Sequence, residues 1–315
     1  METDCHYCGE PVEYVDAEQR HFCSYDCQHY FYNTAWALGN GPLPPPPHET
    51  VFDVMESVAP RRPVVGAHRG GTPENTMVAF RQAVQAGAQL LELDVRLTAD
   101  NHLVLMHWPV VGPRTDGYGR VSRHTLAELQ ELDAADEYPA LRGRGITVPT
   151  LREFLDEFAP QPDLLFVLDF KDCETAEATL AFIKQYPSVG HRVILSSVLH
   201  RCNRLLREAR ASPAVPVLAD IRDTFRVTVA YWTGRLAHFH FDHDIYGFML
   251  RPTLKHFWCQ GLVDAVHAAG ARVMVCGPEM NKPERMRQAV AMGVDIILTD
   301  RPEQLAEIVC QAALK

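Results

Sequence analysis

The sequence predicts an α/β protein built as a (β/α)8 TIM-type barrel, somewhat irregular, with a small N-terminal module before it. From about residue 60 onward, short β-branched apolar runs alternate with amphipathic stretches, which is the pattern of a parallel sheet with helices outside it. The chain has 315 residues, a length that suits one closed barrel plus an appendage. No Gly-x-Gly-x-x-Gly motif follows an early strand, which disfavours a doubly wound dinucleotide-binding sheet.

Nine segments are candidates for the eight barrel strands. They are residues 64–67, 90–95, 103–107, 164–170, 192–196, 215–219, 238–241, 272–276 and 295–299. Helices are expected over residues 74–86, 173–185, 254–269 and 283–292. The turn between 90–95 and 103–107 is too short for a right-handed crossover. We therefore expect the barrel to be irregular here, or one of these candidates to lie outside the closed sheet.

A proline-rich stretch divides the chain. Gly39, Asn40 and Gly41 lead into the run Pro44-Pro45-Pro46-Pro47, which favours a stiff polyproline II spacer. We therefore predict three parts: an N-terminal module over residues 1–38, a Pro-rich linker over 39–60, and the barrel over 61–315.

The overall charge of the chain limits its partners. The formal net charge is −10, whereas general binding to nucleic acid or to anionic membranes needs basic surfaces. No apolar run reaches the length of a membrane span, and the N-terminus lacks the basic flank and apolar core of a signal peptide. We expect a soluble, cytoplasmic protein without nucleic-acid partners. A phosphorylated substrate is still compatible with this charge, because a bound cation reverses the local sign.

Five cysteines in the predicted barrel stand singly in regular segments. They are Cys173, Cys202, Cys259, Cys276 and Cys310. Such cysteines are typical of small, buried apolar residues in a reducing compartment, so no disulfide is expected among them.

Three carboxylates fall at the ends of predicted strands. Glu92 and Asp94 are two residues apart and therefore share one face of their strand, and Asp169 ends a later strand. The neighbours Leu91, Leu93 and Val95 are apolar, so the strand is expected to be buried, and buried carboxylates need partners or a metal. Three carboxylates with water suit Mg²⁺ or Ca²⁺ better than zinc or copper.

Groups for acid–base chemistry and phosphate binding occur at the same strand ends. His68 and Arg69 follow the first barrel strand, His107 ends the third candidate, and Lys171 stands two residues after Asp169. Two histidines can serve as acid and base, and arginine can hold a phosphate. Taken singly, each is more often structural or solvated. Together they indicate metal-assisted cleavage of a phosphate ester.

These motifs resemble those of the glycerophosphodiester phosphodiesterase family. The matching segments are His68-Arg69-Gly70, Pro73-Glu74-Asn75-Thr76, Ala79-Phe80, Glu92-Leu93-Asp94-Val95, residues 114–119, Val148-Pro149-Thr150-Leu151 and residues 293–302. The resemblance covers roughly residues 62–313. It implies a TIM-type barrel of lipid and glycerol metabolism that hydrolyses glycerophosphodiesters to sn-glycerol 3-phosphate and an alcohol.

The resemblance also implies the roles of individual residues. Glu92, Asp94 and Asp169 would bind the divalent cation, and His68 and His107 would be the acid and base, in an order left open. In substrate and phosphate binding, Arg69 would hold phosphate, Lys171 would lie beside the scissile group, and Glu74 would support the site.

Three positions depart from the family pattern. Trp108 follows His107 where the family usually has Asp. Asp169 replaces the usual Glu and, with Lys171, is similar to the phospholipase D toxins of the sphingomyelinase D type. Glu279 lies where the eighth strand usually ends in Trp-Thr-x-Asn, and is a candidate for binding a hydroxyl or a cationic head group. Two alternatives therefore stay open: a lysophospholipase D acting on lysophospholipids, and a non-catalytic barrel that serves as an adaptor.

The N-terminal module carries two cysteine pairs. Cys5 and Cys8 precede Cys23 and Cys27 at a spacing that indicates a structural, tetrahedral Zn²⁺ site. The module resembles small treble-clef zinc fingers of the TRASH/MYM kind, with His6, His21 and His29 as alternative ligands. The other interpretation is redox-active or unpaired cysteines. Because the module is acidic, we expect a protein partner rather than DNA.

Overall fold

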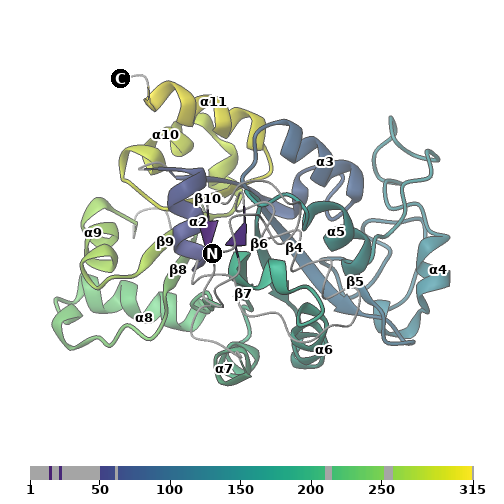
Figure 1. The fold of residues 1–315 in the computed structure, drawn as a ribbon, viewed down its shortest axis with the longest axis horizontal. Helices are drawn as coiled ribbons and strands as arrows, with labels where there is room; N and C mark the ends of the chain where they lie inside the picture. The colour runs from purple at the N-terminus through teal and green to yellow at the C-terminus, as the bar shows by residue number, and fades with distance from the viewer. Residues whose placement is uncertain are drawn as a thin grey trace.

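Parallel strands gather at the centre of the molecule and helices surround them (Figure 1). The computed structural model describes residues 14–15, 21–22, 50–60, 63–209, 215–251 and 258–313. The main sheet has the strand order β7-β6-β4-β3-β10-β9-β8. Its strands are β3 (Val64–Ala67), β4 (Leu90–Leu97), β6 (Leu165–Phe170), β7 (Val193–Ser196), β8 (Ile245–Met249), β9 (Arg272–Cys276) and β10 (Ile296–Thr299). This curled α/β arrangement agrees with the predicted fold class.

A short segment joins the two ends of the curled sheet. Val217 pairs in parallel with Leu195 of β7, and Leu218 pairs in parallel with Ile245 of β8. The Leu218 amide donates to the Leu195 carbonyl at 2.8 Å, and the Ala219 amide donates to the Ile245 carbonyl at 2.9 Å. The predicted strand 215–219 is therefore reduced to these bridges, but it occupies the expected place between its neighbours.

Side chains from each of the seven strands in this order and from the bridging segment meet in one interior cluster. Its buried members are Val51, Val54, Met55, Ala59, Val64, Leu90, Leu165, Val167, Ile194, Leu218, Ile245, Met274, Ile296 and Leu298. Four of them come from α2 (Val51–Val58) and its C-terminal cap, so this helix packs against the strands. The helix begins in a capping box formed by Thr50 and Asp53. It falls within the range 39–60 that the sequence predicts as a linker.

The outer helices begin at residues that cap them. Thr76, Thr150 and Asp172 accept a hydrogen bond from a backbone amide in the first turn of the helix that each precedes. The outer helices are α3 (Met77–Gln85), α4 (Leu126–Gln130), α5 (Leu151–Phe158), α6 (Cys173–Ile183), α7 (His200–Ala209), α8 (Ile221–Trp232), α9 (Gln260–Ala268), α10 (Pro283–Ala291) and α11 (Pro302–Ala313).

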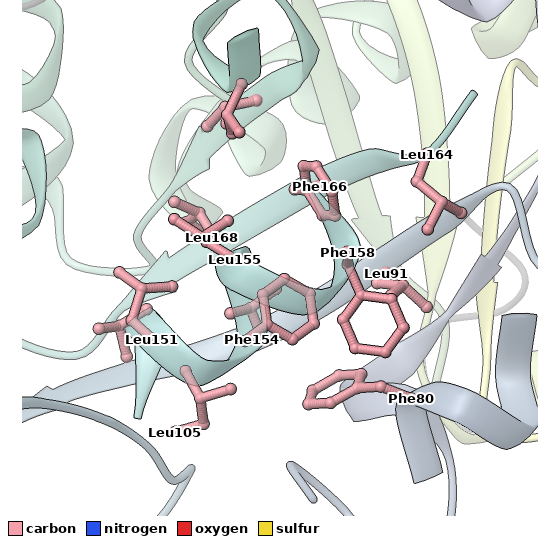
Figure 2. Packing of buried hydrophobic residues seen from close by; sticks show 14 of the residues in the cluster. Phe80, Leu91, Leu105, Leu151, Phe154, Leu155, Phe158, Leu164, Phe166 and Leu168 are labelled. Carbon is pink, nitrogen blue, oxygen red and sulfur yellow. The ribbon is translucent and has the colours of Figure 1, made fainter. Parts of the chain in front are cut away.

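A phenylalanine cluster fixes two of these helices to the sheet (Figure 2). Phe80 of α3 and Phe154 of α5 pack edge to face, with ring centroids 4.8 Å apart, and Phe154 packs against Phe166 of β6 at 5.6 Å. All three rings are fully buried. Burying an aromatic ring of this size stabilises the fold by roughly 2–3 kcal/mol. This packing holds the β4 and β6 strands, which carry the acidic residues, in a fixed position.

The strand candidate 103–107 lies outside the main sheet order. It forms β5 (Leu103–Leu105), which pairs antiparallel with β4. The chain between β5 and α5 has its own small core around Val111, Val121 and Leu129. The predicted irregularity at this point is therefore confirmed.

The strand predicted over 238–241 is wrong. Leu236–His238 is a turn of 3-10 helix, and the strand is β8, a few residues later. Phe239 and Phe241 alternate with the exposed His240, which explains the prediction. The two phenylalanine rings pack on each other at 5.0 Å instead of entering a sheet.

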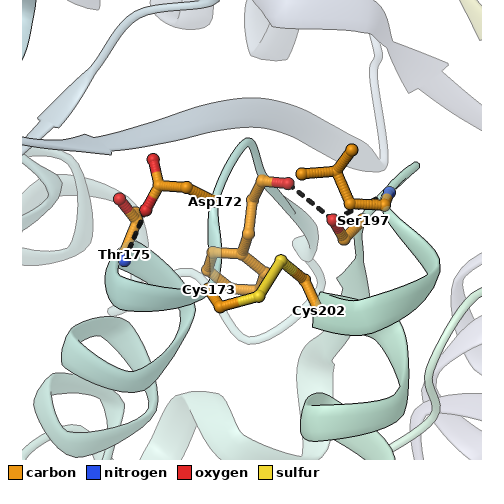
Figure 3. Close-up of a disulfide and its surroundings, with 7 residues drawn as sticks. Asp172, Cys173, Thr175, Ser197 and Cys202 are labelled. Carbon is orange, nitrogen blue, oxygen red and sulfur yellow. Dashed lines mark hydrogen bonds between the residues drawn. A yellow bond between two sulfur atoms is a disulfide. The ribbon is translucent and has the colours of Figure 1, made fainter.

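Two of the cysteines expected to be unpaired form a disulfide. Cys173, the first residue of α6, is bonded to Cys202 of α7 (Figure 3). Their sequence separation of 29 residues gives no signal for pairing. Cys310 is exposed rather than buried, and Cys259 and Cys276 are half-buried. The sequence interpretation of these five cysteines is thus corrected.

Two very short strands are described in the N-terminal module. β1 (Tyr14–Val15) and β2 (His21–Phe22) pair antiparallel. The predicted zinc ligands Cys5, Cys8, Cys23 and Cys27 lie outside the described residues. Within the described part of the chain, we find no helix with both the length and the apolar character that crossing a membrane requires.

Candidate active site

Three buried carboxylates lie side by side on two neighbouring strands. Glu92 and Asp94 belong to β4, and Asp169 of β6 is directly paired with Asp94 in the sheet register. One carboxylate oxygen from each of the three residues lies within 4.8 Å of the other two. The sequence prediction placed these three residues together, and the structure brings them together. An all-oxygen set of this size is the kind that Mg²⁺ and Ca²⁺ prefer.

The negative charge of these carboxylates is not fully neutralised by the protein, which favours binding of a cation. Burial, together with the charge of Asp94, raises the pKa of Glu92 to about 7. Burial acts in the same direction on Asp94, but Lys171 and Arg69 outweigh it and lower the pKa of Asp94 to about 2. The negative charge of ionised Glu92 is therefore neutralised only in part by the nearby side chains His68 and Arg69. A divalent ion would relieve this cost, so the residues present fit a metal.

The turn after β3 directs Arg69 toward these carboxylates. Arg69 and Gly70 both adopt left-handed backbone conformations, with φ of 53° and 73°. A side chain at Gly70 would come within 2.6 Å of Phe80, so only glycine fits here. The backbone amide of Arg69 donates to Glu92 Oε2 at 2.8 Å. The side-chain Nε of Arg69 lies 3.2 Å from Asp94 Oδ2.

Lys171 bridges the two strands from the other side. Its Nζ lies 2.7 Å from Asp94 Oδ1 and also contacts Asp169. Burial alone would lower the pKa of Lys171, but Asp169 and Asp94 raise it above the ordinary lysine value. Asp169 also accepts a hydrogen bond from Ser196 at 3.1 Å. A fixed cation thus stands beside the carboxylate set, as the sequence predicts.

His68 is held by an acidic residue from the last strand. Its Nδ1 lies 2.6 Å from Asp300 Oδ1. Asn281 supports Asp300 by donating to Oδ2 at 2.6 Å and by accepting from the Asp300 amide at 2.9 Å. Burial would lower the pKa of His68, but the bond to Asp300 and the charge of Glu92 raise it.

His107 has a different environment. Its Nδ1 is buried and has no hydrogen-bond partner among the described residues. The Trp108 ring packs edge to face against the imidazole, with centroids 4.9 Å apart. Arg96 fixes the backbone by donating to the His107 carbonyl at 2.6 Å. Burial and the nearby cations Arg69 and Lys171 lower the pKa of His107 to about 4.

Glu74 and Glu279 have local cationic partners. Glu74 accepts from Arg69 Nη1 at 2.9 Å, and its other oxygen lies 2.9 Å from Arg114 Nε. Glu74 thus contacts Arg69, and its role in substrate and phosphate binding stays a prediction. Glu279 is buried and accepts from Lys282 Nζ at 2.6 Å, with Arg285 Nε at 3.3 Å. Substrate binding by Glu279 stays a prediction.

Four residues that sequence reasoning did not assign complete the hydrogen-bond network of the site. Asn75 donates to Asp94 Oδ2 at 2.9 Å; the others are Ser196, Asn281 and Asp300 described above. Asn75 and Asp300 stand within matched motifs, and Asp300 directly follows β10. Ser196 is the last residue of β7, and a position at or just after the end of a barrel strand is the signal that could have identified Asp300 and Ser196. Asn281 carries no such signal.

Known proteins share this fold and its motifs. Residues 67–304 match the model of the glycerophosphoryl diester phosphodiesterase family. A glycerophosphodiester phosphodiesterase of Caldanaerobacter subterraneus is 30% identical over 254 residues, covering 78% of this chain and 97% of the relative.

Solved structures extend the comparison. A glycerophosphodiester phosphodiesterase from Agrobacterium tumefaciens has a TM-score of 0.61 at 25% identity, covering 77% of this chain and 98% of the other. An Oleispira antarctica phosphodiesterase in complex with the product sn-glycerol-3-phosphate has the same fold, with a TM-score of 0.64 at 24% identity, covering 79% of this chain and 97% of the other. The match of residues 67–304 to the family model and the 30% identity to a relative covered almost completely show that this chain belongs to the glycerophosphoryl diester phosphodiesterase family of enzymes.

Proposed function

We propose that the protein hydrolyses glycerophosphodiesters to sn-glycerol 3-phosphate and an alcohol. The observation that carries this proposal is the close placement of Glu92, Asp94 and Asp169. The positively charged side chains of Arg69 and Lys171 both contact Asp94 within this group. The charge of Arg69 acts on both histidines, which supports their assignment to the same site. The relatives named glycerophosphodiester phosphodiesterase support the substrate class.

The two histidines divide the proton transfers. His68, whose pKa is raised by Asp300 and Glu92 in spite of its burial, keeps its proton to higher pH than an ordinary histidine and serves as the acid that protonates the leaving alkoxide. His107, whose pKa is about 4, is neutral and serves as the base. It takes the proton from the nucleophile, either water or a neighbouring hydroxyl of the substrate, as the new P–O bond forms.

The charged residues bind and orient the phosphate. The Arg69 guanidinium neutralises charge that grows on the phosphoryl oxygens, and Lys171 lies on the other side of Asp94 to do the same. Glu92, Asp94 and Asp169 are the residues that would hold Mg²⁺ or Ca²⁺, which supplies further charge stabilisation when bound. Ser196 and Asn75 keep two of these carboxylates in place.

A turnover assay with a panel of substrates tests the proposal. Glycerophosphocholine, glycerophosphoethanolamine and lysophosphatidylcholine are incubated with the protein and Mg²⁺, Ca²⁺ or EDTA, and products are identified by phosphorus NMR. Release of sn-glycerol 3-phosphate that EDTA abolishes is expected. Cleavage of lysophosphatidylcholine alone would favour the lysophospholipase D alternative. Binding of these compounds without turnover would favour a non-catalytic barrel acting as an adaptor.

We also propose that residues 1–38 form a structural zinc module with Cys5, Cys8, Cys23 and Cys27 as ligands. The β1–β2 pair between the two cysteine pairs supports a small folded unit. Such a unit has too little core to fold without metal. The full chain is expected to contain zinc that Cys5→Ser and Cys23→Ser each release, whereas Cys310→Ser retains it. Zinc-free, folded wild-type protein would refute the ligands.

A further inference from the structure

Glu74 is held between two arginines. Its Oε2 accepts a hydrogen bond from Arg69 Nη1 at 2.9 Å and a longer one from Arg114 Nη2 at 3.4 Å. Its Oε1 lies 2.9 Å from Arg114 Nε. The Glu74 side chain is only 13% exposed, so these contacts are made away from bulk water. Arg114 therefore contacts both oxygens of Glu74, whereas the hydrogen bond from Arg69 uses one of them.

Arg114 belongs to a motif that has no task yet in the proposed reaction. It begins residues 114–119, which resemble a motif of the family and lie between β5 and α5. Val111, which is buried in the small core of this part of the chain, fixes the turn. Its carbonyl accepts from the Arg114 amide at 3.1 Å and from Thr115 Oγ1 at 3.0 Å. The backbone that carries Arg114 is thus anchored.

Glu74 and Arg69 stand on one short turn after β3. The Asn75 amide donates to the Arg69 carbonyl at 2.8 Å, which holds the backbone of this turn. Arg114 reaches the turn from 40 residues later in the chain. Arg114 Nη1 also donates to both oxygens of Glu137, at 2.8 and 2.6 Å. Glu137 is 35% exposed, so water screens its charge more than that of Glu74.

The charge of Glu74 bears on the task proposed for Arg69. The charges of Asp94, Glu92 and Glu74 all act on the Arg69 guanidinium, so three carboxylates surround the group that is to bind phosphate. Burial would raise the pKa of Glu74, but the bonds to Arg114 and Arg69 outweigh it and lower that pKa. Glu74 is therefore ionised at neutral pH. Without a second cation beside it, its negative charge would repel an incoming phosphate.

We propose that Arg114 is a positioning residue for phosphate binding. It neutralises Glu74 and holds it in place, so that Arg69 keeps its orientation and its positive charge for the phosphate of the substrate. Arg114 acts through Glu74 rather than on the phosphate itself. This inference rests on the phosphate-binding role of Arg69 in the proposed function, and it gives the motif that begins at Arg114 a task in the reaction.

Calorimetric titration of the full chain with inorganic phosphate tests the proposal. Arg114→Gln should weaken phosphate binding by at least about fivefold, because the charge of Glu74 is then no longer neutralised. Arg114→Lys keeps a positive charge and should lose less. Arg123→Gln removes an exposed arginine that also lies between β5 and α5, and should bind phosphate as wild type does. Urea unfolding of each variant checks that it is folded.

A second background separates this role from a purely structural one. Glu74→Gln leaves no charge for Arg114 to neutralise, so adding Arg114→Gln should then change phosphate binding by less than about twofold. The double variant should therefore bind phosphate more tightly than Arg114→Gln alone. An equal loss from Arg114→Gln in both backgrounds, or no loss in the wild-type background, would overturn the proposal.

The titration is independent of turnover. Wild type that binds phosphate but leaves glycerophosphodiesters intact would contradict the proposed function, and the comparison of these variants would still decide the role of Arg114.

Discussion

The Nδ1 atom of His68 lies 2.6 Å from Oδ1 of Asp300, across the adjacent ends of β3 and β10. A hydrogen bond at Nδ1 fixes the tautomer and leaves Nε2 to exchange a proton. His107 lacks such a partner at its own Nδ1. The pKa of His68 is raised and that of His107 is lowered, and this difference supports the proposal that His68 is the acid and His107 the base.

Replacement of Asp300 should change the alkaline side of the pH–rate profile. In the proposed mechanism activity requires protonated His68, so the rate should fall as the pH rises through the pKa of His68. Asp300 raises that pKa, and Asp300→Asn removes the charge while keeping an oxygen acceptor. The alkaline limb should therefore move to lower pH. Steady-state rates across pH measure this shift, and an unmoved limb would contradict the role of His68 as acid.

Replacement of Trp108 should change the acidic side of the profile. The base His107 must be unprotonated, so activity falls as the pH drops through its pKa of about 4. Trp108→Asp places a carboxylate beside the imidazole and raises this pKa. The acidic limb should move to higher pH. Trp108→Phe keeps an aromatic contact and should leave the acidic limb in place. A shift of this limb in both variants would show that ring packing, not charge, sets the pKa of His107.

Metal affinity should depend on pH through Glu92. The pKa of Glu92 is raised to about 7 without metal, so protons compete with the cation below that pH. Affinity for Mg²⁺ or Ca²⁺ should weaken by about tenfold for each pH unit below 7. Isothermal titration calorimetry measures this, with Glu92→Gln as the variant that loses both affinity and pH dependence. An affinity that is constant across this range would exclude Glu92 as a ligand.

The disulfide should stabilise the fold. Cys173 and Cys202 close a loop with a sequence separation of 29, which corresponds to about 3.6 kcal/mol of unfolding free energy. Urea unfolding of the Cys173→Ser, Cys202→Ser double variant measures the loss, with Cys310→Ser as control. Equal midpoints for wild type and the double variant would show that the bond contributes nothing. A second measurement concerns the compartment. If Cys173 and Cys202 are found oxidised in protein whose free thiols were alkylated inside cells, the protein does not reside in a reducing compartment.

The sequence predicted the parts of the site that local patterns determine. Glu92 and Asp94 share a face because strand side chains alternate, and Asp169 joins them because parallel strands end at one edge. Most strands were also predictable within a few residues, since each is a short apolar run between helices. These features depend only on neighbours in the chain.

The parts that were not predicted depend on distant contacts. Asp300 meets His68 across 232 residues, and no local pattern links them. The partners Cys173 and Cys202 each stand alone in a helix and meet only when α6 packs on α7. The false strand at 238–241 followed from alternating Phe239, His240 and Phe241, whose rings pack on each other instead of entering a sheet.

The central claim is that His68 and His107 carry the two proton transfers of one phosphodiester cleavage. Turnover of glycerophosphocholine by wild type, His68→Ala and His107→Ala tests it most directly, with the 89% exposed His240→Ala as a matched control. We expect sn-glycerol 3-phosphate from wild type and the control, and a loss of activity of at least about a hundredfold in each of the other two variants. Full activity in either His68→Ala or His107→Ala would contradict it.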